Sequence, residues 1–89
     1  MSVRLHPHAT ERMAERGASL AEVVTTVERG NRAAARQGRV SFRLWFKGPW
    51  TWRGQAYNGK EVTAVAVADN GWLVLTVVVR WTRAPEDSA

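Results

Sequence analysis

The residues of this sequence best suited to chemistry form a stripe on its first helical segment. His8, Arg12 and Arg16 are four apart, and each step of four turns a helix by only about 40°, so the three side chains share one edge. An imidazole can move a proton near neutral pH, and guanidinium groups stabilise negative charge on a phosphate. The stripe therefore suggests phosphate chemistry. Ion pairs of Arg12 and Arg16 with Glu11 and Glu15 are the alternative.

A second candidate is the aromatic segment Trp50-Thr51-Trp52-Arg53, in which two indoles accompany a guanidinium. Aromatic rings and arginine can stack on unpaired bases. We take Trp50, Trp52 and Arg53, together with Trp45, as candidate RNA contacts. Tryptophans that complete a small core are the alternative.

Other kinds of site find little support in the sequence. His6 and His8 could each bind a metal, but the chain has no cysteine and no third histidine. A zinc site and a cysteine nucleophile are therefore not expected. Glycine-rich patterns that cradle phosphates are missing as well. We expect neither a metal nor another cofactor.

Composition limits the class of protein. The chain has 89 residues, 13 Lys plus Arg against 8 Asp plus Glu, and a formal net charge of +5, which suits one small domain. Eleven of the cations are arginine, whose bidentate phosphate contacts make nucleic acid the first partner to consider. The lack of cysteine is typical of a cytoplasmic protein, and no apolar run is long enough to span a membrane. We expect a cytoplasmic protein without membrane contact.

The elements that must position these residues begin with two helices. Pro7 at a first helical position and Gly17 past the end predict a helix over residues 7–16. Ser19 and Glu22 form a capping box, which predicts a second helix that ends at Gly30. Its apolar stripe comprises Leu20, Val23, Val24 and Val27. The conformation of residues 31–38 stays open.

Alternation replaces the helical period after Gly38 and predicts strands. One face of the first strand carries Arg39, Ser41, Arg43 and Trp45, and the other carries Val40, Phe42, Leu44 and Phe46. Residues 50–57 are a second strand or a long aromatic loop, followed by a turn at Asn58-Gly59. Residues 60–68 and 72–82 are rich in Val and Thr and predict an antiparallel hairpin.

The turn at Asn70-Gly71 sets the register expected for this hairpin. A two-residue loop there pairs Asp69 with Trp72 and Val65 with Thr76. An apolar face toward the helices then holds Val62, Ala64, Ala66, Ala68, Leu73, Leu75, Val77, Val79 and Trp81. The opposite face holds Glu61, Thr63, Thr76 and Arg80 among valines.

These elements together predict an α+β fold. We expect two N-terminal helices packed on one face of a twisted antiparallel sheet of three to five strands. Residues 1–83 form this single domain, and residues 84–89 are expected to be an acidic flexible tail.

The order of motifs resembles a bacterial family of domains of unknown function. Residues 8–17 carry its H-A-x-x-R-M-x-x-R-G opening, and a capped helix, an arginine-bearing strand and a Val/Thr-rich hairpin follow. That family is similar to RelE-like toxins and to barnase and colicin-type ribonucleases. The resemblance covers roughly residues 5–81 and implies metal-independent RNA cleavage, with His8, Arg12, Arg16 and Thr76 at matched site positions. Arg43 and Arg80 join this set from the polar strand face.

Three functions follow as hypotheses. In a small endoribonuclease toxin, the 2′-hydroxyl of RNA attacks the adjacent phosphate, His8 moves a proton, and Arg12, Arg43 or Arg80 stabilises the phosphorane. A nucleic-acid-binding module keeps the arginines and tryptophans without the chemistry. An interaction domain pairs its exposed sheet with another protein.

The partners expected are RNA, free or on the ribosome, and an antitoxin that covers the polar sheet face or a second copy of the chain. The nuclease hypothesis makes a geometric demand, because His8 must lie within about 10 Å of Arg43, Thr76 or Arg80 to share a phosphate with it.

Overall fold

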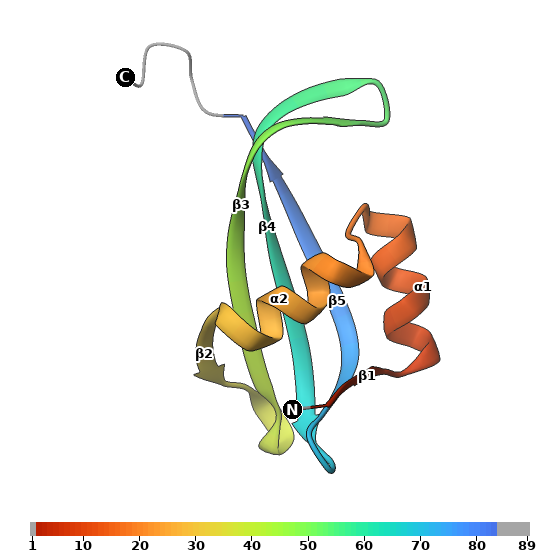
Figure 1. Ribbon diagram of the computed structural model, residues 1–89, viewed down its shortest axis with the longest axis vertical. Helices are drawn as coiled ribbons and strands as arrows, with labels where there is room; N and C mark the ends of the chain where they lie inside the picture. The colour runs from red at the N-terminus through yellow and green to blue at the C-terminus, as the bar shows by residue number, and fades with distance from the viewer. Residues whose placement is uncertain (1, 84–89) are drawn as a thin grey trace.

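Two helices and a five-stranded sheet make up the computed structural model, which describes residues 2–83 (Figure 1). The elements are β1 (Val3–Leu5), α1 (Pro7–Arg16), α2 (Leu20–Arg29), β2 (Asn31–Ala34), β3 (Val40–Trp52), β4 (Gln55–Ala68) and β5 (Trp72–Thr82). A single 3-10 turn, Arg36–Gly38, joins β2 to β3. The α+β class is confirmed. The tail expected at residues 84–89 lies outside the described residues.

The strands follow the order β1-β5-β4-β3-β2. All neighbours are antiparallel except β1, which pairs in parallel with the start of β5. The sheet is therefore mixed rather than purely antiparallel. The sequence did not predict β1 or β2, because three residues are too few to show alternation and all four side chains of β2 are exposed.

The helix bounds match those expected from the capping residues. Gly17 ends α1 in the left-handed conformation at φ 85°, and the capping box of Ser19 and Glu22 is complete. The expected apolar stripe of α2 was wrong in one member, because Leu20 is 56% exposed and Thr26 is fully buried. Thr26 tolerates burial because its hydroxyl donates to the Glu22 carbonyl at 2.7 Å.

The β4–β5 hairpin confirms the expected register away from its turn. Val65 pairs with Thr76, but nearer the turn Ala68 pairs with Trp72, so the loop has three residues instead of two. Leu75 is an extra residue that bulges from β5, and it compensates for the one-residue difference in register.

This bulge exchanges the faces of the first half of β5. Trp72 and Val74 are buried against the core, whereas Leu73 and Leu75, expected there, are half-buried. Such an exchange is what a one-residue slip produces, because neighbouring side chains point to opposite faces.

The turn expected at Asn58-Gly59 was also wrong, since both residues lie inside β4. The β3–β4 hairpin turns at Arg53-Gly54, where both residues have positive φ, 50° and 78°. Residues 50–57 are therefore the tip of a long hairpin, which bends toward α1 (Figure 1).

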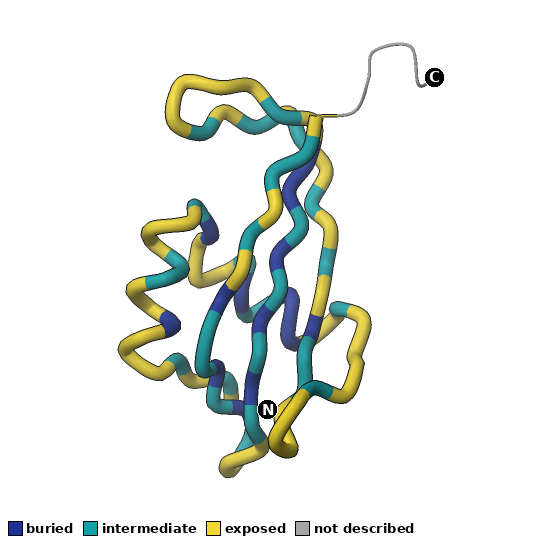
Figure 2. Tube along the Cα trace, turned by 180° about the vertical axis from the view of Figure 1, so that it is seen from behind, coloured by how far each residue is buried: buried dark blue, intermediate teal, exposed yellow. Residues whose placement is uncertain are grey.

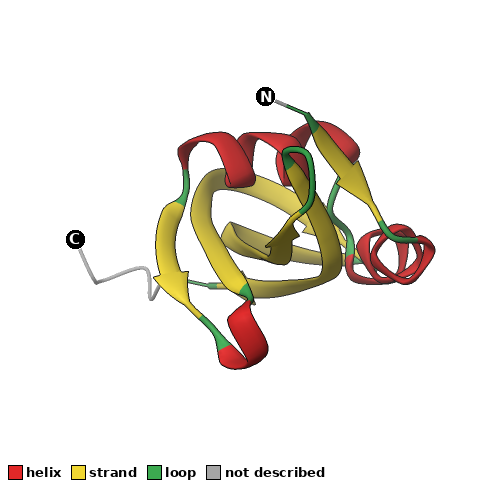
Figure 3. Ribbon diagram, turned by 90° about the horizontal axis from the view of Figure 1, so that it is seen from below, coloured by secondary structure: helices red, strands yellow, loops and turns green. Residues whose placement is uncertain are grey.

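Cross-strand pairs define two faces of the sheet. The helix face carries the rows Val40–Ala66–Val74, Phe42–Ala64–Val77, Leu44–Val62–Val79 and Phe46–Lys60–Trp81. The open face carries the rows Ser41–Val65–Thr76, Arg43–Thr63–Val78 and Trp45–Glu61–Arg80. Seen from behind in Figure 2, no described helix covers the open face, while Figure 3 shows α2 crossing the other side and α1 at the edge of the sheet. Neither described helix is long and apolar enough to cross a membrane.

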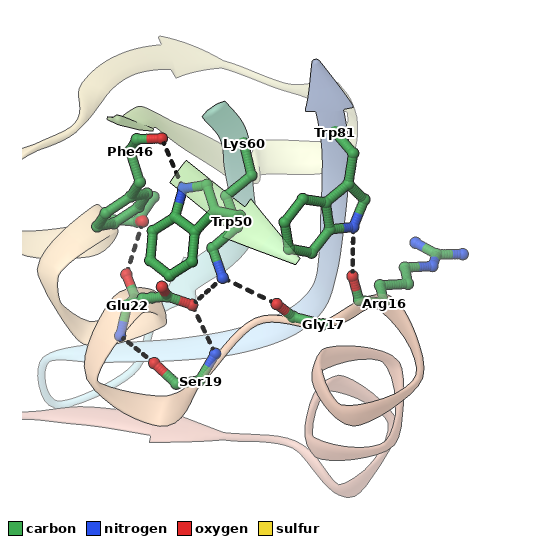
Figure 4. A network of polar contacts seen from close by, with 9 residues as sticks. Arg16, Gly17, Ser19, Glu22, Phe46, Trp50, Lys60 and Trp81 are labelled. Carbon is green, nitrogen blue, oxygen red and sulfur yellow. Dashed lines mark hydrogen bonds and ion pairs between the residues drawn. The ribbon is translucent and has the colours of Figure 1, made fainter. Parts of the chain in front are cut away.

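A buried ion pair joins the helices to the helix face. Lys60 is 4% exposed, and its Nζ donates to Glu22 Oε1 at 2.6 Å and to the Gly17 carbonyl at 2.9 Å (Figure 4). The rings of Trp50 and Trp81 flank the ammonium at 4.3 and 4.9 Å. Because the same Glu22 oxygen accepts from the Ser19 N–H, one carboxylate caps α2 and anchors it to β4.

Glu22→Gln is expected to lower the free energy of unfolding by about 3 kcal/mol, because it leaves a buried ammonium without its counter-charge. Glutamine can still cap the helix, so the loss reports on the ion pair. Urea unfolding measures it, with Glu28→Gln, an exposed charge on the same helix, as the matched control. The two losses from Glu22→Gln and Lys60→Met should not add in the double variant. A Glu22→Gln loss no larger than the control's would contradict this role.

Candidate functional site

A pocket at the β5 edge brings two histidines together with the β5 bulge. It has a volume of about 350 Å³ and is lined by His6, His8, Arg39, Leu75 and Thr76. Two imidazoles, a guanidinium and a hydroxyl therefore surround a space large enough for a phosphate group. We call it the edge pocket. Two residues of the nuclease hypothesis, His8 and Thr76, line this one pocket.

The position of α1 explains how His8 reaches this pocket. The pairing of β1 with β5 ends near Val74, whose carbonyl accepts from the His6 N–H at 2.9 Å. Beyond that point α1 packs along β5, where Ala9 is fully buried and Arg16 Nη1 donates to the Val77 carbonyl at 2.9 Å. The helix thus covers an edge of the sheet, and its first turn lies next to the open face.

The bulge in β5 supplies the wall of the pocket. Leu75 is the extra residue, and the next residue, Thr76, resumes the pairing with β4. Both line the pocket, although neighbouring residues in a regular strand would point to opposite faces. The bulge therefore places an apolar side chain and a hydroxyl beside the imidazoles.

The two histidines differ in their hydrogen bonding. His6 caps α1, and its Nδ1 accepts from the His8 backbone N–H at 3.0 Å. This bond requires the tautomer with hydrogen on Nε2, so His6 presents a donor. Within the described part of the chain, the imidazole of His8 makes no hydrogen bond or ion pair, which leaves it able to accept a proton.

Arg39 reaches the pocket from the start of β3, which is separated from β5 by β4. It follows the 3-10 turn, which lies on the opposite side of the sheet from α2 (Figure 3). Its side chain is exposed and forms no ion pair with any residue from 2 to 83. Arg39 and His6 were not among the site residues expected from the sequence. The alternation of side chains along β3 could have indicated Arg39, and the His-x-His spacing could have indicated His6.

The expected stripe of His8, Arg12 and Arg16 divides in the structure. Arg12 Nη1 forms ion pairs with Glu15 at 2.6 Å and Glu11 at 3.6 Å, and Arg16 binds the edge of β5. Neither arginine lines the edge pocket. The stripe therefore combines one pocket residue, one arginine paired within α1 and one arginine that joins α1 to β5.

Arg43 and Arg80 lie on the open face and share one carboxylate. Glu61 forms ion pairs with Arg80 at 3.4 Å and with Arg43 at 3.8 Å, and the two arginine side chains are 71% and 61% exposed. They stand on the two rows that follow Thr76 along the sheet. They are therefore placed to contact a polyanion that extends from the pocket, rather than the pocket itself.

Three of the four expected RNA contacts lie at the hairpin tip. Trp50 donates its indole N–H to a β3 carbonyl at 3.1 Å, and Trp52 stacks on Trp81 with ring centroids 5.5 Å apart. Arg53 donates to a carbonyl in the last turn of α1 at 2.9 Å. These side chains join the tip to the helices. Trp45 differs, since it lies on the open face and is 51% exposed.

Among the described residues, no three His, Cys, Asp or Glu side chains cluster in a way that could hold a metal ion.

Comparison with known proteins found no matching family model, no matching curated protein and no matching solved structure. A function for this chain must therefore be inferred from its own residues and their arrangement.

Glu61→Gln should strengthen binding of a phosphate polyanion to the open face, because it releases two arginines from their shared carboxylate. The slope of log affinity against log salt should become steeper by about one. The measurement is a titration of polyuridylate by fluorescence anisotropy at several salt concentrations. Glu11→Gln, the same change on the exposed side of α1, is the control. Equal slopes for the two variants would show that the open face does not contact phosphates.

Proposed function

We propose that this chain is a small endoribonuclease-like domain that cleaves RNA in the edge pocket by acid-base chemistry, without a metal ion. The observation that carries the proposal is the convergence of His6, His8, Arg39 and Thr76 around one pocket at the margin of a cationic sheet face. The resemblance of residues 8–17 to domains related to RelE-like and barnase-type toxins agrees with it.

The proposed reaction assigns one task to each group. The 2′-oxygen of the ribose bonds to phosphorus while the bond to the 5′-oxygen breaks, which leaves a 2′,3′-cyclic phosphate. His8 takes the proton of the 2′-hydroxyl, and the departing 5′-oxygen takes a proton from water. The Nε2–H of His6 and the Arg39 guanidinium stabilise charge on the nonbridging oxygens. The Thr76 hydroxyl orients the phosphate between them.

The charge of the open face supports a long substrate. Arg43 and Arg80 stand on successive rows beyond Thr76, so a polynucleotide held in the pocket would continue across them. Phosphate contacts of this kind position a chain without reading its sequence. Ribosome-bound RNA and free RNA are both long enough to cross the open face in this way. We propose that the activity is cytoplasmic.

A noncatalytic RNA-binding module is the second candidate. It is favoured by the exposed side chains of the pocket, because an open site does not shield a reacting phosphate from water. In either case, a protein that covers the open face, such as an antitoxin, would block the site.

Purified protein should cleave unstructured RNA in the presence of EDTA and leave 2′,3′-cyclic phosphate ends. His8→Ala should reduce the rate by about 10²- to 10⁴-fold, as the loss of a general base does, and Arg39→Ala by a factor on the order of 10². Gel electrophoresis of end-labelled RNA measures both. Arg29→Ala, which removes an exposed arginine of α2 from the helix side, is the control.

A substrate with 2′-deoxyribose at the cleaved position should resist cleavage, because it lacks the nucleophile. If neither free RNA nor ribosome-bound RNA is cleaved, the nuclease proposal fails. If that same protein binds RNA and loses affinity with Arg39→Ala, the binding module replaces it.

A further inference from the structure

Trp45 is the most exposed of the five tryptophans, all of which the structure describes. The indole N–H groups of Trp50 and Trp81 donate to backbone carbonyls, Trp52 stacks on Trp81, and Trp72 packs edge-on against the core. The Trp45 ring has no hydrogen bond and no ring partner within residues 2–83, and the residue is 51% exposed. An indole of this size is costly to leave in water.

Gly59 provides the surface on which this indole lies. A Cβ atom built on Gly59 would overlap three atoms of the Trp45 ring, Cζ2, Cε2 and Nε1, and Gly59 itself is buried. The part of the ring that carries these atoms therefore lies against the bare backbone of β4, and about half of the residue's surface stays exposed. Gly59 has no positive φ that would require glycine, so the space for the ring is the local reason for it. Glycine inside a strand otherwise weakens it.

Three cations and one carboxylate of the open face lie near the indole. Trp45 stands in one row with Glu61 and Arg80, Arg43 precedes it by two residues on β3, and Lys47 pairs with Gly59 itself. Their charge complements a polyanion rather than an acidic or apolar protein segment. The register places the Cα of Trp45 four residues and two strands from that of Thr76, about 16 Å.

We propose that Trp45, packed against Gly59, is a stacking platform for an unpaired base of single-stranded RNA whose backbone continues from the edge pocket, where Thr76 lies about 16 Å away. This rests on the proposed function, which supplies RNA as the ligand. The platform selects single strands, because a base in a duplex has no free ring face to offer. It holds the substrate and takes no part in the chemical step.

The test separates binding from cleavage with a 2′-O-methyl oligonucleotide, which lacks the nucleophile and is offered as a single strand and as a duplex. Trp45→Ala should weaken binding of the single strand about tenfold, and Trp45→Phe should retain most of the affinity. Gly59→Ala should weaken it to a similar extent, because the added methyl lifts the ring although the tryptophan remains. Leu20→Ala, which removes an exposed apolar side chain of α2 on the helix side, is the matched control.

Urea unfolding of each variant verifies that the fold is retained. On cleavable RNA, Trp45→Ala should raise KM by the same factor and leave kcat unchanged. If Trp45→Ala and Gly59→Ala bind the single strand as tightly as the unaltered protein, or if the duplex binds equally well, the platform is overturned while cleavage can still be observed. If RNA neither binds nor is cleaved, both proposals fall, and a protein partner for the open face takes their place.

Discussion

The positions of both helices depend on one buried ammonium group. Lys60 lies between two indoles on the helix face, and the cost of its burial is offset by a carboxylate and a carbonyl that accept its hydrogen bonds. Both acceptors lie where the two helices meet, since Gly17 ends α1 and Glu22 is in the first turn of α2. The ion pair therefore specifies where this junction meets β4. An apolar contact of the same area would allow more positions, because it has no direction.

The site at the edge of the sheet follows from that anchor. With its C-terminal end held at Gly17, α1 runs along the part of β5 that β1 leaves unpaired, and Arg16 satisfies a carbonyl there. The opposite end of the helix must then lie next to the β5 bulge. His8 is in the first turn, so it reaches the rim of the open face while Ala9, the next residue, is buried in the core. The core and the proposed site thus use neighbouring residues of one helical turn.

Local sequence signals predicted the helices correctly. Where the sequence was misleading, long-range strand pairing determined the structure. Gly17 and the capping box act within one turn, so the helix bounds were readable. Asn58-Gly59 has the composition of a turn, yet pairing with β3 keeps both residues inside a strand. The bulge at Leu75 could not be read from residues 72–79, because nearly all of them are apolar and either register leaves an apolar face. The approach of Arg39 to His8 requires the folded sheet, so alternation alone could assign its face and not its neighbours.

The arginines of this chain form two populations that composition cannot separate. Around α1 and the hairpin tip, Arg12, Arg16 and Arg53 are held by carboxylates or backbone carbonyls. On the open side, Arg39, Arg43 and Arg80 keep exposed guanidinium groups, which gives this face positive charge that a polyanion can approach. Glu61 moderates this field, because it sits between two of these arginines. A face with unopposed arginines would hold any polyanion tightly, and affinity from charge alone does not discriminate. With Glu61 present, a larger share of the proposed RNA binding would come from contacts that distinguish ligands, for which this face offers the exposed indole and the edge pocket.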